Sequence, residues 1–201
     1  MGAPMIHMRP AITTRPARRA DAPLIARLGD MAGEGLPSHL WAGMAHPGED
    51  AFDVGTARAA RCEGAFSWRN ARMAEWHGAP VGVAIDYDLG DVAAPGADVL
   101  PLLRPLCELE QAAEGTRYVN VLAVLPQARR RGAARALLAD VAGRTGRDLT
   151  LTVASGNAPA RAFHAALGFD EIARRPMGPG GPAGLSGDWI LLSLQARAQE
   201  G

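Results

Sequence analysis

Residues 118–169 constrain the fold of this chain more than any other stretch, because strand and helix patterns alternate along them. Apolar strands are predicted over 118–124 and over 149–153. Each is followed by apolar residues at helical spacing, over 135–144 and over 157–167. This order of strand, helix, strand and helix is typical of sheets that contain parallel strands and carry helices on their faces.

The elements outside this stretch carry weaker patterns, which come from apolar spacing and from the positions of Gly and Pro. The predicted strands cover residues 11–17, 71–76, 81–87, 169–174 and 189–194, and the predicted helices run from an Asp21 N-cap to Gly33 and over 39–45, 51–62 and 102–114. Together they predict one α/β (or α+β) domain over residues 11–196, with a mixed central sheet of about six or seven strands flanked by helices. Tails are expected at 1–10 and 197–201.

Composition narrows the class of protein. The 201 residues suit one compact domain, and 21 basic and 21 acidic residues give no net charge, so we expect neither nucleic acid nor an anionic membrane surface as a partner. The two cysteines form no CxxC pair, and we expect no metal site. No apolar run approaches the roughly 18 residues of a membrane span, and the first ten residues lack the apolar core of a signal peptide. We therefore expect a cytoplasmic protein.

The turn between the first strand and helix of this stretch is rich in arginine and small residues: Arg129-Arg130-Arg131-Gly132-Ala133-Ala134. Small residues allow a ligand to approach the backbone, and the first amides of a helix have no internal partners. With three arginines beside a positive helix end, the turn suits a diphosphate, although a solvated basic turn would have the same sequence. It is neither a GxxxxGK[ST] loop nor a GxGxxG turn.

This turn resembles motif A of the GNAT superfamily of N-acetyltransferases, whose loop follows the pattern Q/R-x-x-G-x-G/A. The Val124-Leu125-Pro126 segment before it is also similar to the family's V-x-P. The resemblance implies that backbone amides from Arg129 to Ala134 hold the pyrophosphate of coenzyme A. It also implies that strand residues Leu122, Ala123 and Val124 lie along the pantetheine arm, with the Val124 amide or one beside it polarising the thioester carbonyl.

A second segment, from Asn157 to Phe169, is similar to the family's N-x-x-A-x-x-L-Y-x-x-x-G-F pattern. There Asn157 would contact the pantetheine arm or cap the helix, and Ala160 and Phe163 would face the cofactor. The resemblance implies acetyl-CoA as cosubstrate and a primary amine of a small molecule or a peptide as acceptor, without a metal. It also allows a homodimer.

Two residues depart from the family pattern at positions that matter for catalysis. His164 replaces a Tyr that often protonates the leaving thiolate; an imidazolium could do the same, or His164 could be a buried packing residue. Asn120 replaces a Glu that often serves as base; it could order a water that accepts the proton, or it could bond to a neighbour.

Other residues are candidates for the acceptor side. Glu34, Glu108, Glu110 and Asp86 are possible bases, and each could equally be a surface carboxylate. Glu34, Asp86 and Trp41 are the candidates for the acceptor pocket, although core packing is the commoner role of a Trp.

Two alternatives stay open. A non-catalytic acyl-CoA sensor on the same fold would bind the cofactor without turnover. A different α/β nucleotide-binding domain would use the arginine turn for another phosphate, and competition between acetyl-CoA and ATP would distinguish it.

Overall fold

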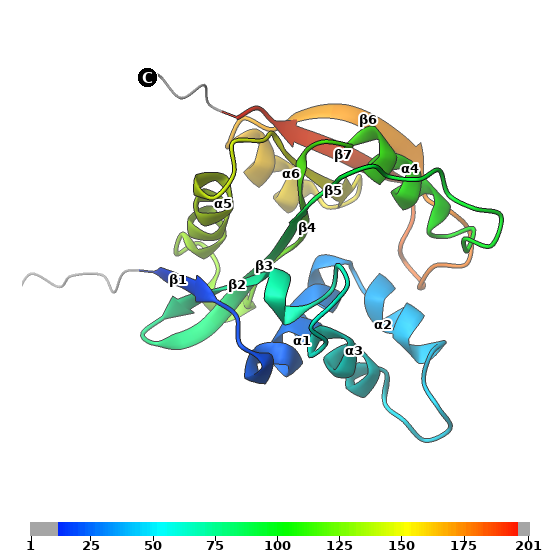
Figure 1. The fold of residues 1–201 in the computed structure, drawn as a ribbon, viewed down its shortest axis with the longest axis horizontal. Coiled ribbons are helices and arrows are strands. Elements are labelled where there is room, and N and C mark those ends of the chain that lie inside the picture. Colours follow the sequence, from blue (N-terminus) through cyan, green and yellow to red (C-terminus); the bar gives the residue numbers. More distant parts are fainter. Residues whose placement is uncertain (1–11, 197–201) are drawn as a thin grey trace, which may run out of the picture.

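A computed structural model describes residues 12–196, and its sheet has seven strands: β1 (Thr13–Pro16), β2 (Ala71–Trp76), β3 (Ala79–Asp88), β4 (Arg117–Val124), β5 (Leu149–Ala154), β6 (Asp170–Pro176) and β7 (Asp188–Leu194). They lie in the order β1-β2-β3-β4-β5-β7-β6 (Figure 1). Only the β4–β5 pair is parallel, and the other neighbours are antiparallel. The predicted mixed sheet of an α/β domain is confirmed.

Six α-helices accompany the sheet within the described residues: α1 (Ala22–Ala32), α2 (Leu36–Ala42), α3 (Ala51–Ala59), α4 (Arg104–Ala112), α5 (Ala133–Gly143) and α6 (Ala158–Ala165). α5 and α6 pack on one face of the sheet, where they share an apolar core with β3, β4, β5 and β7. α1 and α3 pack on the other face over β2, β3 and β4. α4 lies farther along that face, over the β5, β7 and β6 half (Figure 1).

The β2–β3 hairpin closes through two residues, His77 and Gly78, which both have positive φ, at 53° and 75°. A two-residue turn of this kind matches the twist of the flanking strands. The turn joins β2 and β3 into a hairpin, and β3 begins at Ala79, two residues before the predicted start of that strand.

Helix boundaries follow local backbone signals that the apolar spacing did not locate. α2 begins at Leu36, three residues before the predicted start, because Gly35 turns the chain with a φ of 84° and Pro37 fits the first turn of a helix. Asp21 stands at the predicted N-cap position of α1, but its side chain does not cap the helix. Its carboxylate accepts from Arg15 and from the Arg18 amide, and it makes no capping bond to α1. Among residues 12–196 no helix is long and apolar enough to cross a membrane.

Candidate active site

β4 and β5 pair at only two positions before they diverge. Arg117 lies opposite Leu149 and Tyr118 opposite Thr150, and no pair follows. The Leu125 amide donates to the Val81 carbonyl of β3. Since successive residues of a strand direct their main-chain groups to opposite sides, those of Leu122 and Val124 point away from β3 and toward the gap. β4 therefore has a free edge along the predicted pantetheine site.

A β-bulge interrupts β4 beside this gap. Ile85 of β3 lies opposite Val121 and Asp86 lies opposite Val119, so Asn120 is the extra residue with no partner in the ladder. A bulge re-aims the side chains around it. Asn120 is half-buried and lies four residues, or ~13 Å of strand, before Val124.

The arginine turn presents its backbone amides. Arg130 and Gly132 both adopt positive φ, at 61° and 94°, on either side of Arg131. In the part of the chain that the structure describes, the amides of residues 130–134 donate to no protein acceptor. A Cβ added to Gly132 would meet no atom within 4 Å, so the space above the turn is open. Consecutive free amides at a helix N-terminus form an anion site.

Two of the three arginine side chains hold the turn in place. The Arg129 Nε donates to the Val124 carbonyl at 3.3 Å, which ties the turn to the end of β4. The Arg131 guanidinium lies over the Trp76 ring, 3.9 Å from its centroid. Arg130 is exposed, and Ala133 is buried under the first turn of α5. The cation–π contact fixes the Arg131 side chain while its amide stays free.

Asn157 links α6 to the loop between α1 and α2. Its Oδ1 accepts from the Ala160 amide at 3.1 Å, so the predicted cap of this helix is confirmed. Its Nδ2 donates to Glu34 Oε1 at 2.8 Å. Ala160 and Phe163, the other residues predicted on this side of the cofactor, pack half-buried against the core that α5 and α6 share.

His164 is only 6% exposed and lies between the rings of Phe163 and Phe169, with centroids 5.2 and 5.3 Å away. Its Nδ1 is buried without a hydrogen-bond partner in the described residues. This burial lowers the pKa of His164 to about 4. At neutral pH the imidazole is therefore uncharged, and this geometry supports the packing role of His164, not the imidazolium acid.

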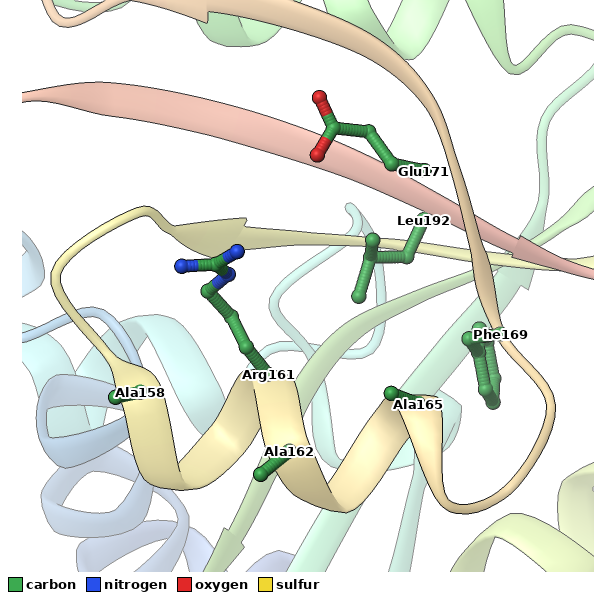
Figure 2. A pocket seen from close by; sticks show the side chains of 7 residues that line it. All are labelled: Ala158, Arg161, Ala162, Ala165, Phe169, Glu171 and Leu192. Carbon is green, nitrogen blue, oxygen red and sulfur yellow. The ribbon is translucent and has the colours of Figure 1, made fainter.

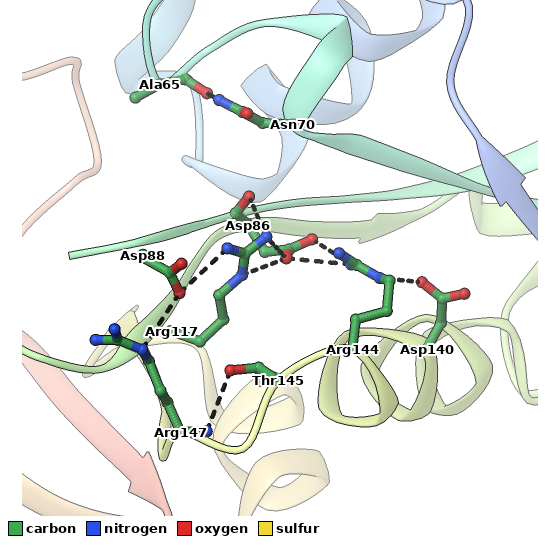
Figure 3. Close-up of polar contacts among 9 residues, drawn as sticks. All are labelled: Ala65, Asn70, Asp86, Asp88, Arg117, Asp140, Arg144, Thr145 and Arg147. Atoms are coloured by element: carbon green, nitrogen blue, oxygen red, sulfur yellow. Dashed lines mark hydrogen bonds and ion pairs between the residues drawn. The ribbon is translucent and has the colours of Figure 1, made fainter. Parts of the chain in front are cut away.

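Two of the three predicted acceptor-pocket residues lie inside the protein. Trp41 is 4% exposed and contacts the rings of Phe52 and Phe66, so it packs in the helical layer. Asp86 is 1% exposed and pairs with Arg117 and Arg144 (Figure 3). Because this buried carboxylate is already engaged by two guanidinium groups, it is not free to contact an acceptor amine.

A tyrosine that the sequence analysis did not single out stands where the two strands begin to diverge. The Tyr118 hydroxyl donates to Thr152 Oγ1 at 3.1 Å, which bridges β4 and β5 beyond their last pair. Its ring lies 5.8 Å from that of Tyr87. Strand alternation alone showed only that Tyr118 is buried; the bridge depends on where β5 lies.

A separate hollow of about 390 Å³ lies between α6 and the β6–β7 pair (Figure 2). Its walls include Arg161 and Ala165 of α6 and Glu171 of β6. None of the residues predicted to bind the cofactor lines it.

Comparisons with known proteins identify the family and the fold. Residues 44–169, more than half of the chain, match the acetyltransferase (GNAT) family. No match was found among curated proteins.

Solved structures share the fold. An N-acetyltransferase from Staphylococcus aureus Mu50 aligns with a TM-score of 0.62 at 15% identity, over 90% of this chain and all of that one. YncA from Salmonella typhimurium, solved with its cofactor acetyl-CoA, aligns with a TM-score of 0.57 at 20% identity, over 95% and 97% of the two chains. The ribosomal-protein-S18-alanine N-acetyltransferase from Escherichia coli aligns at 0.56 and 18% identity, over 95% and 99%. With the family match over the β4–α5 turn and α6, the chain belongs to the GNAT family of acetyltransferases.

Proposed function

We propose that this protein is an N-acetyltransferase that moves the acetyl group of acetyl-CoA to a primary amine of a small molecule or a peptide. The observation that carries the proposal is the run of free amides at residues 130–134, which continues the free edge of β4. A diphosphate matches the first feature and an amide-bearing arm matches the second, and coenzyme A has both.

In this proposal the chain acts mainly by positioning. The turn amides bind the pyrophosphate, and Leu122 and Val124 pair with the pantetheine arm across the gap. Because the arm runs down β4 from the turn, the acyl group reaches the bulge, where the Leu122 amide is the nearest free donor on the gap side. It would hold the oxyanion that forms during attack. Asn120 would order the water through which a proton leaves, and no metal takes part.

We specify the acceptor only as a primary amine. The Escherichia coli neighbour is named for an alanine of a ribosomal protein, which supports a peptide amine as one choice. Glu34 lies in the α1–α2 loop, where it accepts from Asn157 at the start of α6, and it is the predicted acceptor-pocket residue that is exposed.

Calorimetry with acetyl-CoA tests the proposal. We expect micromolar binding to the wild type and none to Gly132→Glu, because the new carboxylate would occupy the open space above the turn and repel the pyrophosphate. Gly132→Ala is the matched control. It costs about 1 kcal/mol of backbone strain at a φ of 94° but adds no charge, so it should still bind. Equal affinity of all three proteins would contradict the loop assignment.

A non-catalytic acyl-CoA sensor is the second candidate, favoured by the asparagine at the bulge and by the neutral, buried His164. Release of free thiol from acetyl-CoA on a panel of primary amines separates the two. An enzyme releases thiol with at least one amine, whereas a sensor binds acetyl-CoA and releases none.

A further inference from the structure

α4 carries a carboxylate on its buried side. Leu106, Leu109 and Ala113 of this segment pack toward the sheet in an apolar cluster with Tyr118 and Trp189 of β4 and β7. Glu110 lies four residues after Leu106 and three before Ala113, so it falls on the same face of the helix. Glu110 is half-buried there, while a glutamate without a role is normally found on the opposite, solvated face.

Glu110 has no partner that would explain its position. Within residues 12–196 no cation pairs with its carboxylate and no donor bonds to it. Glu108 on the same helix is different, because it accepts from Arg175 of β6 at 2.9 Å. An unpaired carboxylate in an apolar cluster costs folding free energy, so stability alone does not account for Glu110.

The titratable groups around Glu110 come from four elements. They are Tyr87 of β3, Tyr118 of β4 and Cys107 of α4 itself, with the Glu108–Arg175 pair toward β6. Burial, and after it the charge of Glu110, raises the pKa of both tyrosines. Burial also raises the pKa of Glu110. The two tyrosines therefore stay neutral, and Glu110 is the carboxylate among these groups that can take up a proton.

The tyrosines place Glu110 at the acyl end of the site. Tyr118 bridges β4 to Thr152 of β5 at the point where the gap opens, and the bulge at Asn120 lies two residues further along β4. The pyrophosphate turn stands at the other end of the same strand. A cofactor lying along β4 would thus direct its acyl group toward the part of the sheet that α4 covers.

We propose that Glu110 is the catalytic base of the transfer, supplied by the helix between β3 and β4 in place of the strand position that Asn120 occupies. This proposal rests on the proposed function. Glu110 takes one proton from the acceptor's ammonium group, either directly or through a water at Asn120, and the neutral amine attacks the thioester carbon. The C–N bond forms and the C–S bond breaks. The second amine proton goes to the thiolate, and Glu110 returns its proton to solvent.

The chemistry suits this position. A carboxylate whose pKa is raised by burial is a stronger base than one in water. Its negative charge also attracts the cationic amine more strongly in apolar surroundings than it would in water. The adjacent tyrosine rings and leucines favour an amine that is attached to an apolar or aromatic group.

The test compares Glu110→Gln with Glu108→Gln as the matched control. Thiol release from acetyl-CoA is followed with phenethylamine and with an alanine-initiated peptide, and with water alone as acceptor if neither amine reacts. We expect Glu110→Gln to lower kcat/KM roughly 10²-fold to 10⁴-fold, the usual contribution of a general base, and to remove the acidic limb of the pH profile. Glu108→Gln should keep both the rate and the limb.

Two further measurements distinguish a catalytic Glu110 from one with a structural role. They also distinguish a failure of this proposal from a failure of the proposed function. Calorimetry should give the same acetyl-CoA affinity for Glu110→Gln as for the wild type, and the thermal midpoint should not fall, because an unpaired buried charge has been removed. A wild type that fails to bind acetyl-CoA would refute the proposed function. A wild type that binds and turns over, with Glu110→Gln equal to it in rate and pH profile, would refute Glu110 alone.

Discussion

Asp86 carries the densest set of charged contacts in the described part of the molecule. Its carboxylate lies within 2.9 Å of Arg144 and closer still to Arg117, and Arg144 also reaches Asp140 (Figure 3). These contacts join β3 at the bulge to β4 and to the end of α5. Asp86 thus holds the helix whose other end forms the arginine turn at residues 129–134.

Replacing Asp86 should be costly for stability. Asp86→Asn leaves two arginines without their buried partner and should lower the free energy of unfolding by about 2 kcal/mol. The loss is smaller than for a fully buried ion pair because both arginines keep some contact with water. Urea unfolding followed by circular dichroism measures it. Asp88→Asn is the control. Its side chain is 53% exposed, so its ion pair with Arg117 should contribute less than about 1 kcal/mol. Equal losses in the two variants would contradict this account.

His164 should make stability depend on pH. Burial lowers its pKa from 6.5 to about 4, so between these values the unfolded chain binds a proton that the folded protein does not. The contribution of the neutral His164 to stability is therefore fully present above pH 6.5 and is lost as pH falls toward 4. From pH 7 to pH 5 the wild type should lose about 2 kcal/mol more than His164→Phe does. Urea unfolding at both pH values checks this, and a loss of the same size in His164→Phe would refute it. His39→Gln, at an exposed histidine, should behave as the wild type.

At the scale of single residues, contacts between residues close in the sequence were predictable and contacts between distant residues were not. The Asn157 cap was predictable because its bond to Ala160 spans three residues. The place of Asp86 was not, because Arg117 and Arg144 lie 31 and 58 residues away along the chain. Trp41 could line a pocket or fill a core on sequence alone, and only the positions of Phe52 and Phe66 decide it.

At the scale of elements, α6 and the α1–α2 loop are joined by one side chain. Asn157→Ala should remove both the cap and the bond to Glu34 and should lower stability by about 1 kcal/mol. Asn157→Asp keeps a capping oxygen but places a second carboxylate beside Glu34, so it should recover stability only when combined with Glu34→Gln. Urea unfolding of the four proteins tests this. If Asn157→Asp alone were as stable as the wild type, the link to Glu34 would carry no weight.

The elements between residues 118 and 169 were predictable because their signals are local. Apolar spacing marks the strands and helices, and Gly132 and Asn157 mark two helix starts. α4 was also predictable as a helix, over 102–114, but its orientation was not. The face that carries Glu110 meets β6 and β7, which lie some sixty to eighty residues further along the chain.

At the scale of the whole molecule, the central feature is a sheet whose two halves separate between β4 and β5. The antiparallel strands β1 to β4 form one half and β5, β7 and β6 form the other, joined by two residue pairs (Figure 1). The mixed sheet was predictable from the order of elements. The gap was predictable only through the resemblance to the family, because no residue of β4 or β5 prevents further pairing by itself.

Amide hydrogen exchange along β4, with and without acetyl-CoA, tests this account most directly. The amides of Leu122 and Val124 face the gap, whereas that of Ala123 faces β3 and serves as an internal control. We expect acetyl-CoA to slow exchange at Leu122, at Val124 and at Gly132 in the turn, with much less change at Ala123. Unchanged exchange at Leu122 and Val124 under saturating acetyl-CoA would contradict it.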